Sequence, residues 1–168
     1  MITTGVTGQP WRASVTAWGA IEPWGDAPPL NWFVAADDRW HVPADESAVR
    51  QQRVEGTPVV ETRVRVPNGD VVHRVYSVAD GGGLTVVEVE NESTMPVAIA
   101  FDRRDVLTER EIADVPIEGI ELAAEAFVLP LGHQAVLRVA IVHGVQRSGP
   151  LPAALATPTQ VVRGWLSL

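Results

Sequence analysis

The residues best suited to bind a ligand lie near the N-terminus, where five of the six tryptophans fall within the first forty positions. Trp32 and Trp40 flank a polar segment that contains Asp37 and Asp38. Indole rings stack on sugar rings and on partner surfaces, because they combine a large apolar face with one hydrogen-bond donor. Carboxylates in the intervening turn could accept hydrogen bonds from hydroxyl groups. The spacing predicts a ligand-binding site of Trp32, Trp40, Asp37 and Asp38, with core packing of the tryptophans as the alternative.

No pattern of these or other polar residues is a specific catalytic or metal-binding signature. Glycoside hydrolysis needs two carboxyl groups at a defined separation, which the sequence does not provide. His133 and His143 bracket one expected strand, so they lie roughly 30 Å apart and cannot share an ion. His73 falls on an inward face, where a hydrogen-bonded core histidine is expected. We therefore expect no catalytic residue, no metal and no cofactor.

Composition excludes several further classes of protein. The chain has 168 residues, a formal charge of −8, and neither cysteine nor lysine. Disulfides, thiolate nucleophiles and cysteine zinc sites are excluded, as are P-loop and Schiff-base lysines. Excess carboxylate repels phosphate backbones, so nucleic acid is not expected as a partner. No apolar stretch approaches the roughly 18 residues that span a bilayer, and the first residues lack the features of a secretion signal, which predicts a cytoplasmic protein without a membrane partner.

The elements that must position these residues are mostly short strands, of which the clearest form a hairpin. Residues 59–66 and 71–78 flank the turn sequence Pro67-Asn68-Gly69-Asp70. Asn-Gly supplies the positive φ angles of a type I′ turn, which predicts that Val66 pairs with Val71. Because side chains alternate along a strand, one mainly apolar face of the hairpin is expected to face the core. It carries Val60, Thr62, Val64, Val66, Val71, His73 and Val75. The other face is expected to be mostly solvated. It carries Glu61, Arg63, Arg65, Val72, Arg74 and Tyr76.

Further turn signals at 80–83 and 91–95 predict that the hairpin continues as a meander through strands at 84–90 and 96–102. Residues 135–142 are apolar on both sides apart from Arg138 and predict a central strand covered on both faces. Other expected strands lie at 12–20, 30–35, 40–42 and 126–131. Many short strands with frequent turns favour an all-β fold, namely an antiparallel β-sandwich.

The C-terminal end carries the signature of a helix. Thr157-Pro158-Thr159-Gln160 combines an N-cap threonine, a proline at the first helical position and a capping-box glutamine, so a short helix is expected from Pro158. We expect residues 1–152 to form the sandwich domain and 153–168 a connector and the start of this helix. Two interpretations of this helix stay open: it continues in a longer protein, or it is a short terminal helix that packs back on the sheet.

The run from Leu84 to Phe101, a strand, an Asn/Ser/Pro turn and a returning strand, resembles the N-terminal β-sandwich domains of bacterial glycogen-debranching and glucoamylase-like proteins. The segments 31–34 and 37–41 share the resemblance, and the capped helix from Thr157 is similar to the start of the (α/α)6 barrel that follows in such proteins. The family implies a noncatalytic sandwich that packs on a helical barrel, helps to shape its sugar-binding cleft and leaves the catalytic carboxylates to the barrel.

Three functions are weighed on this basis. The preferred one is a noncatalytic accessory domain of a carbohydrate-active protein, whose partner is a C-terminal helical domain or a second copy of the chain. This function predicts a sizeable apolar patch near the terminal helix. The second is a stand-alone module that binds carbohydrate or another small ligand through the N-terminal tryptophans. The third is an enzyme with a polar pocket around His41 or His73.

Overall fold

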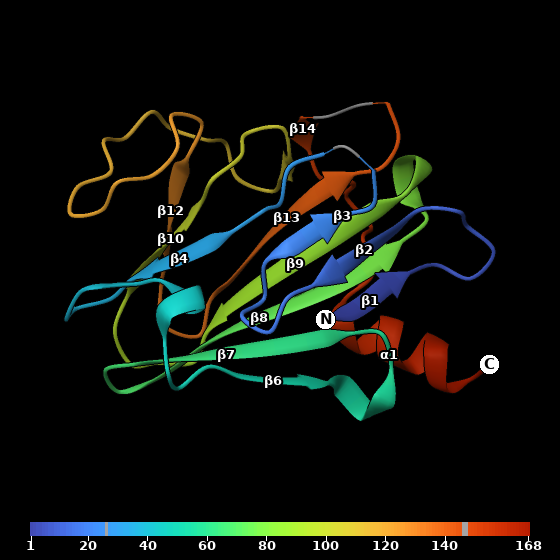
Figure 1. Ribbon diagram of the computed structural model, residues 1–168, viewed down its shortest axis with the longest axis horizontal. Helices are drawn as coiled ribbons and strands as arrows, with labels where there is room; N and C mark the ends of the chain where they lie inside the picture. The colour runs from blue at the N-terminus through green and yellow to red at the C-terminus, as the bar shows by residue number, and fades with distance from the viewer. Residues whose placement is uncertain (26, 146–147) are drawn as a thin grey trace.

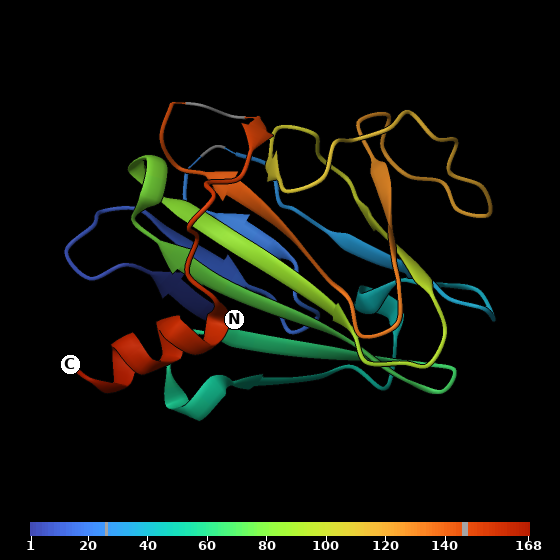
Figure 2. The ribbon, with the colours of Figure 1, turned by 180° about the vertical axis from the view of Figure 1, so that it is seen from behind.

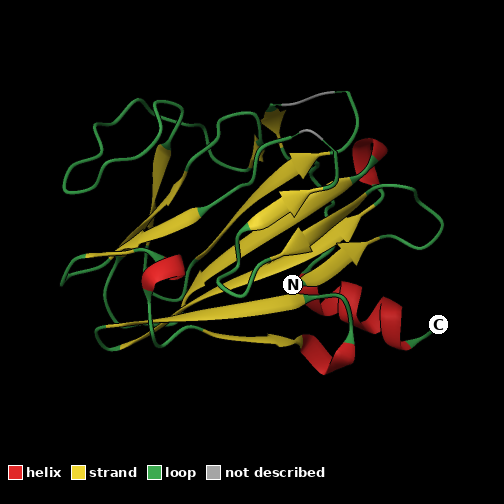
Figure 3. Cartoon of the chain, in the orientation of Figure 1, coloured by secondary structure: helices red, strands yellow, loops and turns green. Residues whose placement is uncertain are grey.

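The chain folds into strands joined by loops, with an α-helix near its C-terminal end (Figure 3). The computed structural model describes residues 1–25, 27–145 and 148–168. The strands are β1 (Ile2–Gly5), β2 (Arg12–Val15), β3 (Ile21–Pro23), β4 (Trp32–Ala35), β5 (Trp40–His41), β6 (Arg50–Arg53), β7 (Val60–Val66), β8 (Gly69–Val78), β9 (Leu84–Asn91), β10 (Val97–Phe101), β11 (Leu107–Thr108), β12 (Phe127–Leu131), β13 (Val136–Val142) and β14 (Gly149–Pro150). The helices are α1 (Pro158–Leu166) and the short 3-10 turns η1 (Pro43–Asp45), η2 (Val54–Gly56) and η3 (Asp80–Gly82).

The strands form two layers, which confirms the predicted all-β fold, an antiparallel β-sandwich with a short C-terminal helix. One layer is a sheet in the order β14-β11-β13-β9-β8-β7-β6, antiparallel except where β11 meets β14. The other layer consists of two smaller sheets, β12-β10-β4-β5 and β1-β2-β3, which both cover one face of the large sheet (Figure 1). No helix within the described ranges combines the length and the apolar character that a bilayer-spanning segment requires.

The main hydrophobic core lies between the two layers. It contains inward side chains of the large sheet, such as Val75 and Val87, together with Trp32, Ile99 and Phe101 from the smaller sheets. All of these are buried, and most are β-branched or aromatic residues, which pack well on a pleated surface. The core therefore holds the large sheet rigid and leaves its other face to be shaped by polar residues and α1.

The predicted hairpin forms from β7 and β8, but its register differs by two residues from the prediction, because Val64 rather than Val66 pairs with Val71. The prediction of a type I′ turn was also wrong. Pro67 has its φ fixed near −65° and cannot take a positive value, whereas Asn68 has a φ of 67°, a combination that matches a type II turn. A shift of two residues keeps every side chain on its face. The predicted core face is therefore confirmed, and its members are buried: Val60, Thr62, Val64, Val66, Val71, His73 and Val75.

The predicted meander is wrong after β9, because β9 pairs with β8 on one side and with β13 on the other. The chain crosses to the second layer, where β10 lies between β4 and β12. Asn91 holds this crossover. Its buried amide donates to the main-chain oxygens of Met95 and Leu131, and its Oδ1 accepts from the amide and the hydroxyl of Ser93. Gly69 lies against the corner, since an added Cβ would stand 2.7 Å from the Cα of Ser93.

The outer face of the large sheet is covered at one end by α1 (Figure 2). Val162 of α1 and Leu155 before it pack with Val59, Tyr76 and Val86 of the sheet region in a second hydrophobic cluster. This corrects the prediction of a mostly solvated outer face, which took Tyr76 to be exposed. The large sheet is thus covered on one face by the second layer and on part of the other by the helix.

The start of α1 is fixed as the sequence predicted. The hydroxyl of Thr157 accepts a hydrogen bond from the amide of Gln160 (3.2 Å), and the side chain of Gln160 accepts one from the amide of Thr157 (2.9 Å). The hydroxyl of Tyr76 donates to the main-chain oxygen of Ala156 at 2.7 Å, which ties the connector to β8. Together these bonds hold the first turn of α1 above the sheet.

Candidate functional site

The four residues predicted to bind a ligand do not form one surface. Trp32, in β4, is 1% exposed, and its Nε1 donates to the main-chain oxygen of Trp18 at 2.8 Å. Its ring packs against that of His73, with centroids 4.4 Å apart. The ring of Trp32 therefore belongs to the core and offers no free face to a ligand, which corrects the prediction for this residue.

Asp38 lies in a network around the buried side chain of His41. Nε2 of His41 stands 2.9 Å from Oδ1 of Asp38, and Nδ1 stands 2.7 Å from Oε1 of Glu46. Arg39 donates to both carboxylate oxygens of Glu46, at 2.8 and 3.2 Å. The bond to His41 lowers the pKa of Asp38, and the bonds from Arg39 and His41 lower that of Glu46. The polar atoms of this network bond to one another, which is typical of a structural cluster; we call this network the clasp.

Trp40 and Asp37 lie beside this clasp. Trp40 is partly buried, and its Nε1 donates to the main-chain oxygen of Glu118 at 2.8 Å, which ties β5 to the long loop before β12. Asp37 is exposed. A ligand-binding role for Trp40, Asp37 and Asp38 stays a prediction.

A second group of polar side chains forms a row across the outer face of the large sheet. The strand register places Glu61, Arg74, Glu88 and Arg138 opposite one another on β7, β8, β9 and β13. Adjacent strands are about 4.8 Å apart, so charges of alternating sign become neighbours across the sheet. Sequence reasoning missed this row as a site. The signal was the alternation of acidic and basic residues on the outward positions of these strands, which gains meaning only once the register is known.

Arg74 is the centre of the row. Its Nε donates to Oε2 of Glu61 at 3.0 Å, and its Nη1 donates to Oε1 of Glu90 at 2.8 Å. Glu61 also accepts a hydrogen bond from Nε of Arg63 at 2.9 Å. Burial raises the pKa of Glu61, but the bonds from Arg63 and Arg74 outweigh it and hold that pKa below its ordinary value. The guanidinium group of Arg74 is therefore fixed in place and its charge is balanced.

Glu88 lies between Arg74 and Arg138 in the row without a hydrogen bond to either. Its Oε1 is 3.6 Å from Nη1 of Arg74, while Arg138 donates to Glu109 at 3.3 Å. The side chain of Glu88 is 12% exposed, and burial raises the pKa of its carboxyl group. Within the described residues, Nε of Arg138 is also buried without a hydrogen-bond partner. Glu88 thus keeps hydrogen-bonding capacity that the surrounding residues do not use.

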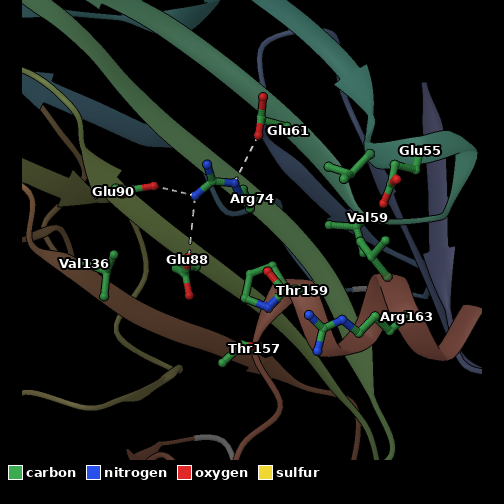
Figure 4. Close-up of a pocket in the computed structure, with 13 residues that line it drawn as sticks. Glu55, Val59, Glu61, Arg74, Glu88, Glu90, Val136, Thr157, Thr159 and Arg163 are labelled. Carbon is green, nitrogen blue, oxygen red and sulfur yellow. Dashed lines mark hydrogen bonds and ion pairs between the residues drawn. The ribbon is translucent and has the colours of Figure 1, made fainter.

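Four of the charged side chains form the floor of a cleft of about 750 Å³ (Figure 4), namely Glu61, Arg74, Glu88 and Glu90. The start of α1 forms one wall through Thr157, Thr159 and Val162, and η2 contributes Val54 and Glu55 at the rim. Figure 4 shows Arg74 held among Glu61, Glu88 and Glu90 on the sheet, with Arg163 on the helix side. The remaining lining residues are Val59, Val136 and Pro158. A concave surface with aliphatic walls and a few convergent polar groups is the usual form of a small-ligand site.

The chemistry open to this cleft is hydrogen bonding to a polar ligand. Carboxylates accept and guanidinium groups donate, and both are planar groups that can bond two neighbouring polar atoms at once. In the part of the chain that the structure describes, no group of three or more histidine, aspartate or glutamate side chains could hold a metal ion.

No protein-family model, curated protein or solved structure matches the chain. The family resemblance drawn from 84–101 therefore stays a prediction, and the functional argument rests on the geometry of the cleft.

Proposed function

We propose that the chain is a noncatalytic β-sandwich domain that binds a carbohydrate in the cleft between the outer sheet face and α1. The observation that carries the proposal is the position of Glu88, a largely buried carboxyl group in the floor of the cleft to which no described residue donates a hydrogen bond. A sugar hydroxyl is a neutral donor that can fill this position. Burial of a polar group away from water costs free energy unless the group gains such a partner.

The rest of the lining agrees with a polyhydroxylated ligand. Arg74 and Glu90 hold polar atoms in fixed positions, while Val54 and Val136 offer aliphatic contact to the C–H groups of a sugar ring. The lining contains more carboxylates than guanidinium groups, which disfavours a phosphorylated ligand. A neutral or amine-bearing sugar therefore suits the cleft better than a nucleotide.

The proposal is tested by NMR titration of the 15N-labelled chain with the disaccharides maltose and cellobiose. Binding in the cleft should shift the amide resonances of Arg74, Glu88 and Thr159. Arg74→Ala should weaken binding at least about tenfold, because it removes the short hydrogen bond that fixes Glu90 and one of those that fix Glu61. Arg65→Ala is the matched control, since Arg65 is an exposed residue of the neighbouring strand outside the cleft.

Shifts that gather at Trp40 and Asp38 instead would move the site to the residues first predicted from the sequence. An unchanged spectrum with both sugars and with their longer oligomers would sink the proposal. Release of hydrolysis products during the titration would show an enzyme rather than a binding domain, with Glu88 as the first candidate for the proton donor because its pKa is raised by burial.

A second candidate role, as an accessory domain that packs on a helical catalytic domain, is favoured by an apolar groove beside α1. This groove of about 280 Å³ is lined by Val78 of β8 and by Val161, Trp165 and Leu168, and Leu168 is 84% exposed. These apolar side chains support the sizeable apolar patch predicted near the terminal helix. The sequence of the complete gene tests the role: several hundred further residues in amphipathic helices would support it, and a stop codon after Leu168 would contradict it.

The cytoplasmic location stays a prediction, checked by fractionation of the cells that make the protein.

A further inference from the structure

The charges that line the cleft are unequal in number and in how they are used. The acidic side chains are Glu55, Glu61, Glu88 and Glu90, and the basic ones are Arg74 and Arg163. Arg74 makes its short hydrogen bonds to Glu61 and Glu90, at 3.0 and 2.8 Å. The charge of the only guanidinium group in the floor is therefore taken up by two carboxylates, among the lining residues that the structure describes.

Among the three carboxylates in the floor, Glu61, Glu88 and Glu90, Glu88 is the one that this arrangement leaves without close compensation. Arg74 approaches it no closer than 3.6 Å, and Arg138 on the other side is bonded to Glu109. Burial disfavours the ionised form of Glu88 and so raises the pKa of its carboxyl group. A ligand that brings a positive charge to this carboxylate would relieve the penalty, whereas a neutral hydroxyl supplies a donor but no charge.

We propose that the cleft prefers a sugar that carries a protonated amino group, with the ammonium group bound to Glu88. The inference rests on the proposed carbohydrate-binding function and names the class of sugar. An ammonium group has three N–H donors, so it can bond Glu88 and still reach a second carboxylate of the floor such as Glu90. Charge-assisted hydrogen bonds are roughly twice as strong as neutral ones, which sets the size of the preference.

The experiment compares three disaccharides with the same β-1,4 linkage at about pH 6: glucosamine disaccharide, its N-acetylated form and cellobiose. Dissociation constants come from NMR titration of the intact chain. The glucosamine disaccharide should bind about tenfold more tightly than the other two, since one charged hydrogen bond in place of a neutral one is worth about 1.4 kcal/mol. Glu88→Gln keeps the shape of the side chain and should reduce the difference to about twofold, with cellobiose affinity little changed. Glu22→Gln, at an exposed position on β3, is the control and should leave the preference intact.

The outcomes separate the inference from the function it rests on. Equal binding of all three sugars in the cleft would overturn the amine preference and leave the carbohydrate site standing. Binding of none would remove both. A preference that persists in Glu88→Gln would mean that the overall negative charge attracts the amine, and it too would overturn the inference. If Glu88→Gln does not fold, the side-chain carboxyl carbon of Glu88 in the parent chain reports directly, because its resonance must move with the glucosamine disaccharide.

Discussion

Arg74 faces Glu88 directly across the register of β8 and β9, but it makes its short hydrogen bonds to Glu61 and Glu90 instead. The pair stands at 3.6 Å, compared with 2.8 Å from Arg74 to Glu90. A cross-strand ion pair normally stabilises a sheet by the contact of the two facing side chains. Here the guanidinium group bonds instead to Glu61, which faces it from β7, and to Glu90, which lies two residues beyond Glu88 on β9. Glu88 is left as a buried acid whose ionised form is poorly compensated.

Glu88→Gln and Glu90→Gln should therefore change stability in opposite directions. The raised pKa of Glu88 means that its ionised form is worse placed in the folded than in the unfolded chain, so stability falls as pH rises above the ordinary glutamate pKa. Glu88→Gln should remove this loss and raise the unfolding free energy at pH 7. Glu90→Gln should lower it by roughly 0.5–1 kcal/mol, because it weakens the bond to Arg74. Urea denaturation at pH 7 and at pH 3 measures both effects.

At pH 3 the gain in stability from Glu88→Gln should vanish, because the carboxyl group of Glu88 is then protonated in both the folded and the unfolded parent chain. A loss of stability at pH 7 in Glu88→Gln would show that attraction by Arg74 and Arg138 exceeds the cost of burial. That result would also weaken the case for Glu88 as the ligand-binding carboxylate.

Acid should destabilise the protein through His73, whose ring is buried in the core beside Trp32. Burial lowers the pKa of His73 from 6.5 to about 3, so the folded state resists protonation while the unfolded state accepts it. Stability from this group is present in full above pH 6.5 and is lost as pH falls towards 3. Each pKa unit corresponds to about 1.4 kcal/mol, so the loss reaches at most about 5 kcal/mol at the acid end. Comparison of histidine variants by urea denaturation between pH 6.5 and 5 isolates it. Asp38, Glu46 and Glu61 have lowered pKa values and act at lower pH, and the raised pKa of Glu88 affects the parent chain and the histidine variants alike.

The matched variants are His73→Gln and His133→Gln, the second at an exposed position. His73→Gln should flatten the pH dependence in this range, while His133→Gln should keep that of the parent chain. Equal slopes of the unfolding free energy against pH in all three proteins would show that the ring of His73 gains a proton in the folded chain. Ring resonances of His73 that stay those of the neutral imidazole at pH 5 would support the argument without any substitution.

The faces of the strands could be predicted from the sequence, whereas their register and partners could not. Alternation of apolar and polar residues is local, so the core face of 60–66 and 71–75 was found. The register depends on the turn, and Pro67 excludes the type I′ geometry that Asn-Gly otherwise favours. The partner of 84–91 was missed because β13, more than forty residues later, occupies the edge that a meander would have used.

The candidate site depended on these long-range facts. Trp32 alternates with Val34 in β4, and this period of two could have placed both in the core. The row of Glu61, Arg74 and Glu88 was visible only as separate charged residues, because their alignment needs the registers of three strands at once. The capped start of α1, by contrast, is a local feature and was predicted to the residue.

Thr157→Ala and Thr159→Ala form a matched pair that tests whether the N-cap holds the wall of the cleft. Thr157 accepts a hydrogen bond from the amide of Gln160, whereas Thr159 is exposed and lies two positions further along the helix. Loss of an N-cap costs about 1 kcal/mol, and the cost falls on α1 because the sheet beneath it has its own core. Thr157→Ala should therefore speed amide hydrogen exchange at Val161 and Val162 about fivefold and leave β8 unchanged, while Thr159→Ala should change neither. Equal exchange in the two variants would mean that packing of Val162, and not the cap, fixes the helix above the cleft.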